Sequence, residues 1–113
     1  MNIEIAVIDY LRETLETDRV YAEVPEVKTG IFFVTDKIGS STENRICTST
    51  VAIQSYAGSK LEASEQNERL KEAMEGITAL DDISSCSLDT DYDYTNIAKK
   101  QYRYQAVYEI THY

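Results

Sequence analysis

Apolar residues near the start of the chain recur every three or four positions, while charged residues fill the positions between them. The periodic apolar residues are Ile5, Ile8, Leu11 and Leu15. This spacing predicts an amphipathic helix over residues 2–17 that buries one stripe. Asn2 precedes the stripe and has a side chain that commonly caps a helix N-terminus.

A second helical pattern follows Gly58. Ser59 and Glu62 have the spacing of a capping box. The stripe that we expect to be buried consists of Ala63, Leu70, Ala73, Met74 and Ile77, with Asn67 as a polar interruption. Glu65 and Arg69 are spaced to form an i,i+4 ion pair on the solvent side. Gly76 stands where a left-handed residue often ends a helix.

β-prone residues dominate the segments outside these helices. The predicted strands cover residues 20–24, 31–38, 45–56, 85–94 and 101–111. The polar segment Gly39–Asn44 is interpreted as a turn or longer loop, and as a segment that becomes ordered on binding. In the last strand the even positions from Tyr102 to Ile110 are apolar or aromatic, which predicts one packed face and one largely solvated face.

The order of these elements is helix, strands, helix, hairpin. That order predicts an α+β fold, with a mostly antiparallel sheet and two main helices packed on one face. The length of 113 residues fits a single domain that spans residues 1–113.

The net charge changes the range of partners that we expect. Twenty acidic residues against 11 basic ones give a formal charge of −9, which argues against a surface that grips nucleic acid. No segment approaches the roughly 20 apolar residues of a membrane span, so no membrane partner is expected. Cys47 and Cys86 are the two cysteines, and we interpret them as buried thiols, with a disulfide as the alternative.

Asp89, Asp91 and Asp93 form the densest group of acids in the chain. A calcium loop of the EF-hand type would place Gly and Glu where this sequence has Tyr94 and Lys100, so the calcium interpretation fails. In an extended strand alternate residues share a face. The spacing therefore predicts an acidic ridge on one face of a strand, either solvated or facing a partner.

Candidate catalytic chemistry is sparse. His112 is the single histidine and lies near the C-terminus, where we expect fraying. No GxSxG motif surrounds a serine, and one His with two distant Cys does not make a zinc site. We therefore predict no catalytic residue, no metal and no cofactor. A hydrolase that uses a pair of carboxylates remains an alternative, because 20 acids leave many pairs open.

Nine tyrosines are present, and tyrosine is frequent both in cores and at interfaces. Tyr102, Tyr104 and Tyr108 are expected to pack in the sheet core. Tyr56, Tyr92 and Tyr94 lie near strand ends, where core and interface are both open. Together with the acidic ridge they are the candidate interface residues.

Three segments carry a resemblance to a known family. They are Thr50–Tyr56 (TVAIQSY), the helical segment SKLEASEQNERLKEAM, and the final strand RYQAVYEIT that ends at Thr111. In this order they resemble the small tail completion, or tail terminator, proteins of long-tailed bacteriophages and prophages. The similarity covers roughly residues 3–111. It departs from the family at Gly30–Phe33, where the aromatic strand of the family often begins with a Pro-Tyr pair.

The resemblance implies a non-enzymatic virion structural protein, made in the bacterial host cytoplasm. Such proteins form a ring, typically hexameric, at the head-proximal end of the tail. The implied partners are other copies of the chain, the tail tube protein and the head–tail connector proteins. DNA would pass through an acidic lumen that repels it, with the aspartate ridge at the lumen or rim. A connector, stopper or minor capsid protein is one alternative, and an acidic DNA-mimic inhibitor is another.

Overall fold

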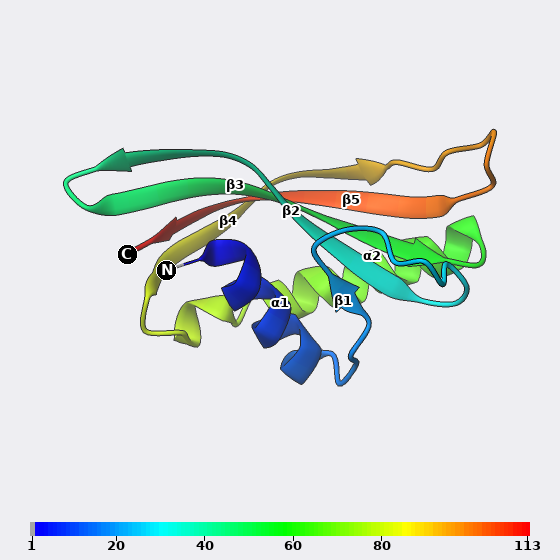
Figure 1. The fold of residues 1–113 in the computed structure, drawn as a ribbon, viewed down its shortest axis with the longest axis horizontal. Helices are drawn as coiled ribbons and strands as arrows, with labels where there is room; N and C mark the ends of the chain where they lie inside the picture. The colour runs from blue at the N-terminus through cyan, green and yellow to red at the C-terminus, as the bar shows by residue number, and fades with distance from the viewer. Residues whose placement is uncertain (1) are drawn as a thin grey trace.

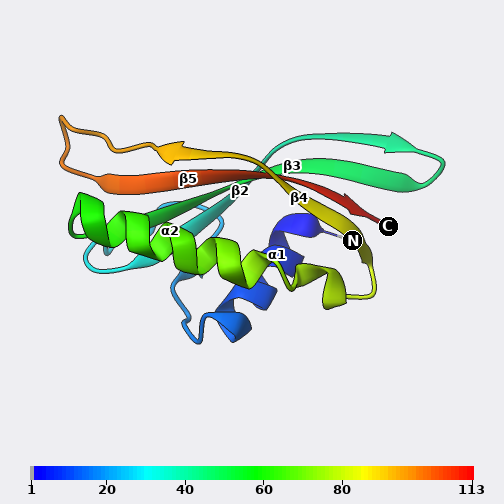
Figure 2. The ribbon, with the colours of Figure 1, turned by 180° about the vertical axis from the view of Figure 1, so that it is seen from behind.

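The computed structural model describes residues 2–113, which form a twisted sheet layer with two helices beneath it (Figures 1 and 2). In chain order the elements are α1 (Ile3–Thr14), β1 (Val20–Tyr21), β2 (Phe32–Glu43), β3 (Ile46–Ala57), α2 (Lys60–Met74), the 3-10 helix η1 (Ile77–Ala79), β4 (Ile83–Asp93) and β5 (Tyr102–His112). The strand order is β1-β2-β3-β5-β4, and only the β1–β2 pair is parallel. The α+β prediction is confirmed. No helix within residues 2–113 is long and apolar enough to cross a membrane.

Helix α1 is shorter than predicted and buries a different stripe. Asn2 caps it as expected, since its side chain accepts hydrogen bonds from the Glu4 and Ile5 backbone N–H groups. The stripe is made by Ile3, Val7, Ile8 and Leu11, with Leu15 just past the helix end. Ile5 is 56% exposed, so its assignment to the core was wrong. At ~100° per residue it lies about 120° from the centre of the stripe.

Helix α2 follows its prediction closely. The Ser59 hydroxyl accepts a hydrogen bond from the Glu62 N–H, and all five stripe residues are buried. The expected Glu65–Arg69 pair does not form within residues 2–113. Arg69 donates instead to the Leu15 carbonyl at 2.6 Å and to Gln66, so its guanidinium ties α2 to the end of α1.

Gly76 is not left-handed, because its φ of −95° leads directly into the right-handed η1. The absence of a side chain matters here for another reason. A Cβ at Gly76 would lie 2.9 Å from the Tyr10 hydroxyl, which donates a 2.6 Å hydrogen bond to the Ala73 carbonyl.

We expect Gly76→Ala to lower the free energy of unfolding by about 1 kcal/mol, because the added methyl group displaces the Tyr10 hydroxyl and breaks this bond. Urea denaturation would measure the loss. The same substitution in a Tyr10→Phe background should cost much less, since that hydroxyl is absent. An equal cost in both backgrounds would contradict this account.

The predicted loop at Gly39–Asn44 is wrong. β2 continues through Gly39 to Glu43, and the turn to β3 consists of Asn44 and Arg45 alone, with φ of 52° and 66°. Two residues with positive φ suit a tight hairpin whose twist matches its strands. A bulge at Ile38 re-registers the pair, so that Gly39 rather than Ile38 pairs with Thr50. The hairpin projects from the left end of the molecule in Figure 1.

His112 does not lie in a frayed end. It is buried in β5, between Cys47 of β3 and Ile83 of β4, and its ring Nε2 lies 2.8 Å from the Ser49 hydroxyl. The prediction for β5 also needs a correction on its other face. Ala106, Tyr108 and Ile110 are buried against the helices as expected, whereas Tyr102 and Tyr104, also expected in the core, are only half-buried. Gln105 and Val107 on the opposite face are buried as well.

Candidate interaction surface

The three candidate aspartates do not form one ridge. Leu88 pairs with Tyr108, and Thr90 pairs with the adjacent residue of β5, Val107. Asp89 therefore has no partner of its own and is the extra residue of a β-bulge. The bulge reverses the alternation of faces along β4. It separates exposed Asp89 from Asp91 and Asp93, which both contact α2 beneath the sheet.

Asp91 joins β4 to the middle of α2. Its Oδ2 accepts hydrogen bonds from Asn67 Nδ2 at 2.8 Å and from Lys71 Nζ at 3.0 Å. Asn67 is buried, and its Oδ1 has no partner within residues 2–113. Glu68 also pairs with Lys71, and together with Asp91 it raises the pKa of that ammonium group. We call Asp91, Asn67 and Lys71 the β4–α2 clasp.

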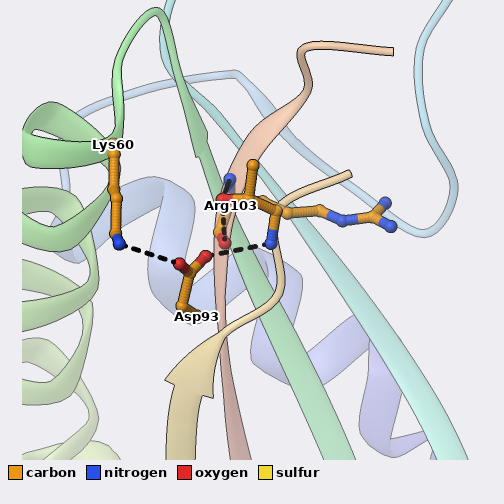
Figure 3. A network of polar contacts seen from close by, with 4 residues as sticks. Lys60, Asp93 and Arg103 are labelled. Carbon is orange, nitrogen blue, oxygen red and sulfur yellow. Dashed lines mark hydrogen bonds and ion pairs between the residues drawn. The ribbon is translucent and has the colours of Figure 1, made fainter. Parts of the chain in front are cut away.

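Asp93 makes a second, more exposed link to the same helix (Figure 3). One carboxylate oxygen accepts the Thr95 N–H at 3.0 Å, and the other lies 3.4 Å from Lys60 Nζ at the start of α2. The Thr95 hydrogen bonds, with a smaller contribution from Lys60, lower the pKa of the Asp93 carboxyl. A depressed pKa means that this link stabilises the fold above the ordinary aspartate pKa and is lost as the pH falls through the folded pKa.

The outer face of the sheet, opposite the helices, carries a continuous row of arginine and aromatic side chains. The Arg19 guanidinium lies over the Phe32 ring at 5.3 Å, and Phe32 stacks on Tyr56 with ring centroids 4.4 Å apart. Arg103 continues the row, 5.5 Å from the Tyr56 ring and 4.6 Å from the Tyr94 ring. Tyr92 meets Tyr94 edge to face at 5.9 Å. We call Arg19, Phe32, Tyr56, Arg103, Tyr94 and Tyr92 the outer ladder.

Hydrogen bonds fix the ladder in place. Arg103 donates from Nη1 to the Tyr56 hydroxyl and from Nε to the Tyr94 carbonyl, both at 2.7 Å. Its side chain extends to the side of the sheet away from Lys60 (Figure 3). Gln105 links the remaining tyrosine by donating to the Tyr92 hydroxyl.

The three candidate tyrosines of the outer ladder differ in how deeply they are buried. Tyr56 is buried and belongs to a second small core with Phe32 and Val34, so core is the correct alternative for it. Tyr92 and Tyr94 are each 41% exposed at the β4 end of the ladder and stay candidates for contact with a partner. The sequence signal for this second core was the uninterrupted apolar run Ile31–Val34, which indicates burial on both faces of a strand.

The tip of the β2–β3 hairpin is exposed to solvent. Every residue from Asp36 to Ile46 is exposed, including the apolar side chains of Ile38 and Ile46. β1 covers the outer edge of β2 only as far as Val34. Beyond it, the Lys37 N–H donates a 3.3 Å hydrogen bond to the Glu4 carboxylate, and the edge then continues without a neighbouring strand among residues 2–113. We call residues 36–46 the hairpin arm.

A scan against family models gave no match for the chain, and a search of curated proteins gave none either.

The contact between the Ser49 hydroxyl and the His112 ring was not predicted from the sequence. Both side chains are buried, and the second ring nitrogen of His112 lies 3.2 Å from the Tyr113 backbone carbonyl. This geometry accounts for the pair as a hydrogen bond that holds β3 to the end of β5. Within residues 2–113 no three His, Cys, Asp or Glu side chains are grouped so that they could hold a metal ion.

Both cysteines are free and half-buried, rather than fully buried as expected. Burial raises the pKa of the Cys86 thiol to about 11, so only about one thiol in a thousand is ionised at pH 8.

In a Cys47→Ser variant we expect Cys86 to react with a thiol reagent about a hundredfold more slowly at pH 8 in the folded than in the urea-unfolded protein. The folded rate should rise about tenfold per pH unit. Equal folded and unfolded rates would contradict this.

Proposed function

We propose that this protein is a non-enzymatic structural subunit that assembles with copies of itself into a closed ring, and that the ring terminates a phage tail tube and joins it to the head connector. The observation that carries the proposal is the hairpin arm. An exposed strand edge is a template for pairing with another chain, and natural monomers usually shorten or cover such edges. Here a 12-residue strand extends far past its two-residue neighbour.

The two ends of the sheet offer different surfaces. β2 with its arm forms one edge, and β4 with the exposed tyrosines of the outer ladder forms the other. A ring needs such a heterologous arrangement, in which one patch of each subunit contacts a different patch of the next. The order and length of the elements support the terminator role through their resemblance to that family. The charge of −9 per subunit suits a channel that DNA passes without binding.

The experiment is native mass by light scattering over a wide range of protein concentration, followed by negative-stain imaging. A closed ring with a central hole is the expected result. A variant in which Asn-Gly replaces Thr42–Cys47 shortens the arm and keeps a two-residue turn, and it should fold normally and fail to close rings. Open filaments, or a monomer at every concentration, would count against the proposal. Co-purification with tube protein rather than portal separates a terminator from a connector.

A further inference from the structure

An apolar groove lies between α1 and the segment that follows β1. It has a volume of about 520 Å³, and its lining includes Ile5, Ile8, Asp9, Glu23, Val24 and Glu26. Ile8 forms the buried floor, while Ile5 and Val24 expose apolar side chains along it. We call this the α1 groove.

The charge of the α1 groove is negative. Asp9, Glu23 and Glu26 are exposed acids, whereas Arg12 is the single base in the lining. The Arg12 guanidinium is held by the Val20 carbonyl, which accepts from Nε at 3.1 Å and from Nη2 at 2.8 Å. The three acids therefore determine the sign that an incoming group meets.

The turn between β4 and β5 has the opposite character. Ile97 is 85% exposed, the highest exposure of any large apolar side chain in residues 2–113, and Lys99 and Lys100 follow it. Neither lysine ammonium has an ion-pair partner among the described residues. We call residues 97–100 the basic turn. It combines an apolar side chain with two positive charges, and the α1 groove combines an apolar floor with three negative ones.

The basic turn is held in a defined shape. Asn96 and Gln101 exchange two backbone hydrogen bonds of 3.0 Å across its base, and the Lys100 N–H donates to the Ile97 carbonyl at 3.2 Å. The Asn96 side chain accepts from the Lys99 N–H. A turn that is already ordered loses less conformational entropy on binding.

Within one chain the basic turn and the α1 groove cannot contact each other. The β4–β5 turn projects at the upper right of Figure 1, beyond the end of the sheet, while α1 lies below the middle of the sheet. We infer that the basic turn of one copy docks into the α1 groove of a second copy, with Ile97 against Ile5 and Val24 and the two lysines beside Asp9, Glu23 and Glu26. The contact is heterologous, so it propagates from copy to copy. The inference rests on the proposed ring and names one of its subunit contacts.

Charge exchange between the two surfaces provides the test. Lys99→Glu with Lys100→Glu makes both surfaces acidic, and Glu23→Lys with Glu26→Lys makes both basic. Light scattering should show that each variant alone associates at least tenfold more weakly than the unaltered protein. An equimolar mixture should assemble again, since each surface then finds its opposite only on the other variant. Lys28→Glu with Lys60→Glu adds the same charge at exposed positions outside the hairpin arm, the basic turn and the lining of the α1 groove, and is the matched control.

The apolar part has its own matched pair. Ile97→Ala should weaken association about tenfold, whereas Leu61→Ala, which removes an aliphatic side chain that is 71% exposed on α2, should leave it unchanged. Circular dichroism should show native folding for every variant, because all the substituted side chains are exposed.

The outcomes separate this inference from the proposed function. Rings that persist unchanged in both charge variants would overturn the turn–groove contact and leave the ring standing. Open filaments that depend on these charges would support the contact and overturn the terminator role. An unaltered protein that stays monomeric at millimolar concentration would overturn both.

Discussion

Replacing Phe32 with alanine is expected to lower the free energy of unfolding by about 3–5 kcal/mol, although Phe32 lies on the sheet face that no helix covers. Its side chain is 1% exposed, because the Tyr56 ring stacks on one side and the Arg19 guanidinium and Tyr21 pack around it. Alanine would leave a cavity in this second core and remove the stacking of the outer ladder at its centre.

Urea denaturation followed by far-UV circular dichroism measures the loss, since the chain has no tryptophan. Tyr94→Ala is the control within the same ladder. It removes an aromatic ring that is 41% exposed and should cost less than about 1 kcal/mol. If Phe32→Ala cost no more than Tyr94→Ala, the outer face would not contain a packed core.

The outer ladder changes what the two faces of the sheet can do. The helix side carries the main core. On the outer side, the second core buries Phe32, Val34 and Tyr56, whereas Tyr92 and Tyr94 of β4 are exposed. Arg103 connects the two parts, because its guanidinium lies over the Tyr56 and Tyr94 rings and donates to the Tyr56 hydroxyl and the Tyr94 carbonyl. A partner at the β4 end would therefore meet a rigid surface with little side-chain freedom to lose.

Helices were predictable because each carries its own signals. The Ser59 cap and the stripe of α2 lie within one segment, and the structure follows both. The prediction for Ile5 was wrong because a spacing of three residues from Ile8 does not by itself place a side chain on the buried face of α1. Gly39 was misleading for a similar local reason, because a glycine in a polar segment is typical of a loop, yet here it follows a bulge inside β2.

The candidate site was less predictable, because register between distant strands decides it. Asp89, Asp91 and Asp93 occupy alternate positions, as they would on one face of a regular strand. No glycine, which often marks a bulge, lies near them in the sequence. A usable signal lay elsewhere, in Asn67. A buried amide in an apolar stripe requires a polar partner, and an acid on a neighbouring strand is a suitable one.

The β4–α2 clasp gives the other large expected effect. Asp91→Ala should lower the free energy of unfolding by about 1–3 kcal/mol, because it leaves the buried Asn67 amide without its acceptor and Lys71 without one of its two carboxylates. Asp91→Asn should cost less, since an amide oxygen can still accept from Asn67.

Asp89→Ala is the matched control, since it removes an exposed carboxylate from the same strand and should change stability by less than about 0.5 kcal/mol. The pH dependence gives a second check. Glu68 and then Asp91 raise the pKa of Lys71, so their contribution is complete below the ordinary lysine pKa and is lost as the pH rises through the folded pKa. Asp91→Ala should therefore reduce the loss of stability at high pH. If Asp89→Ala cost as much as Asp91→Ala, the bulge would not separate the two residues, and the acids would form one ridge after all.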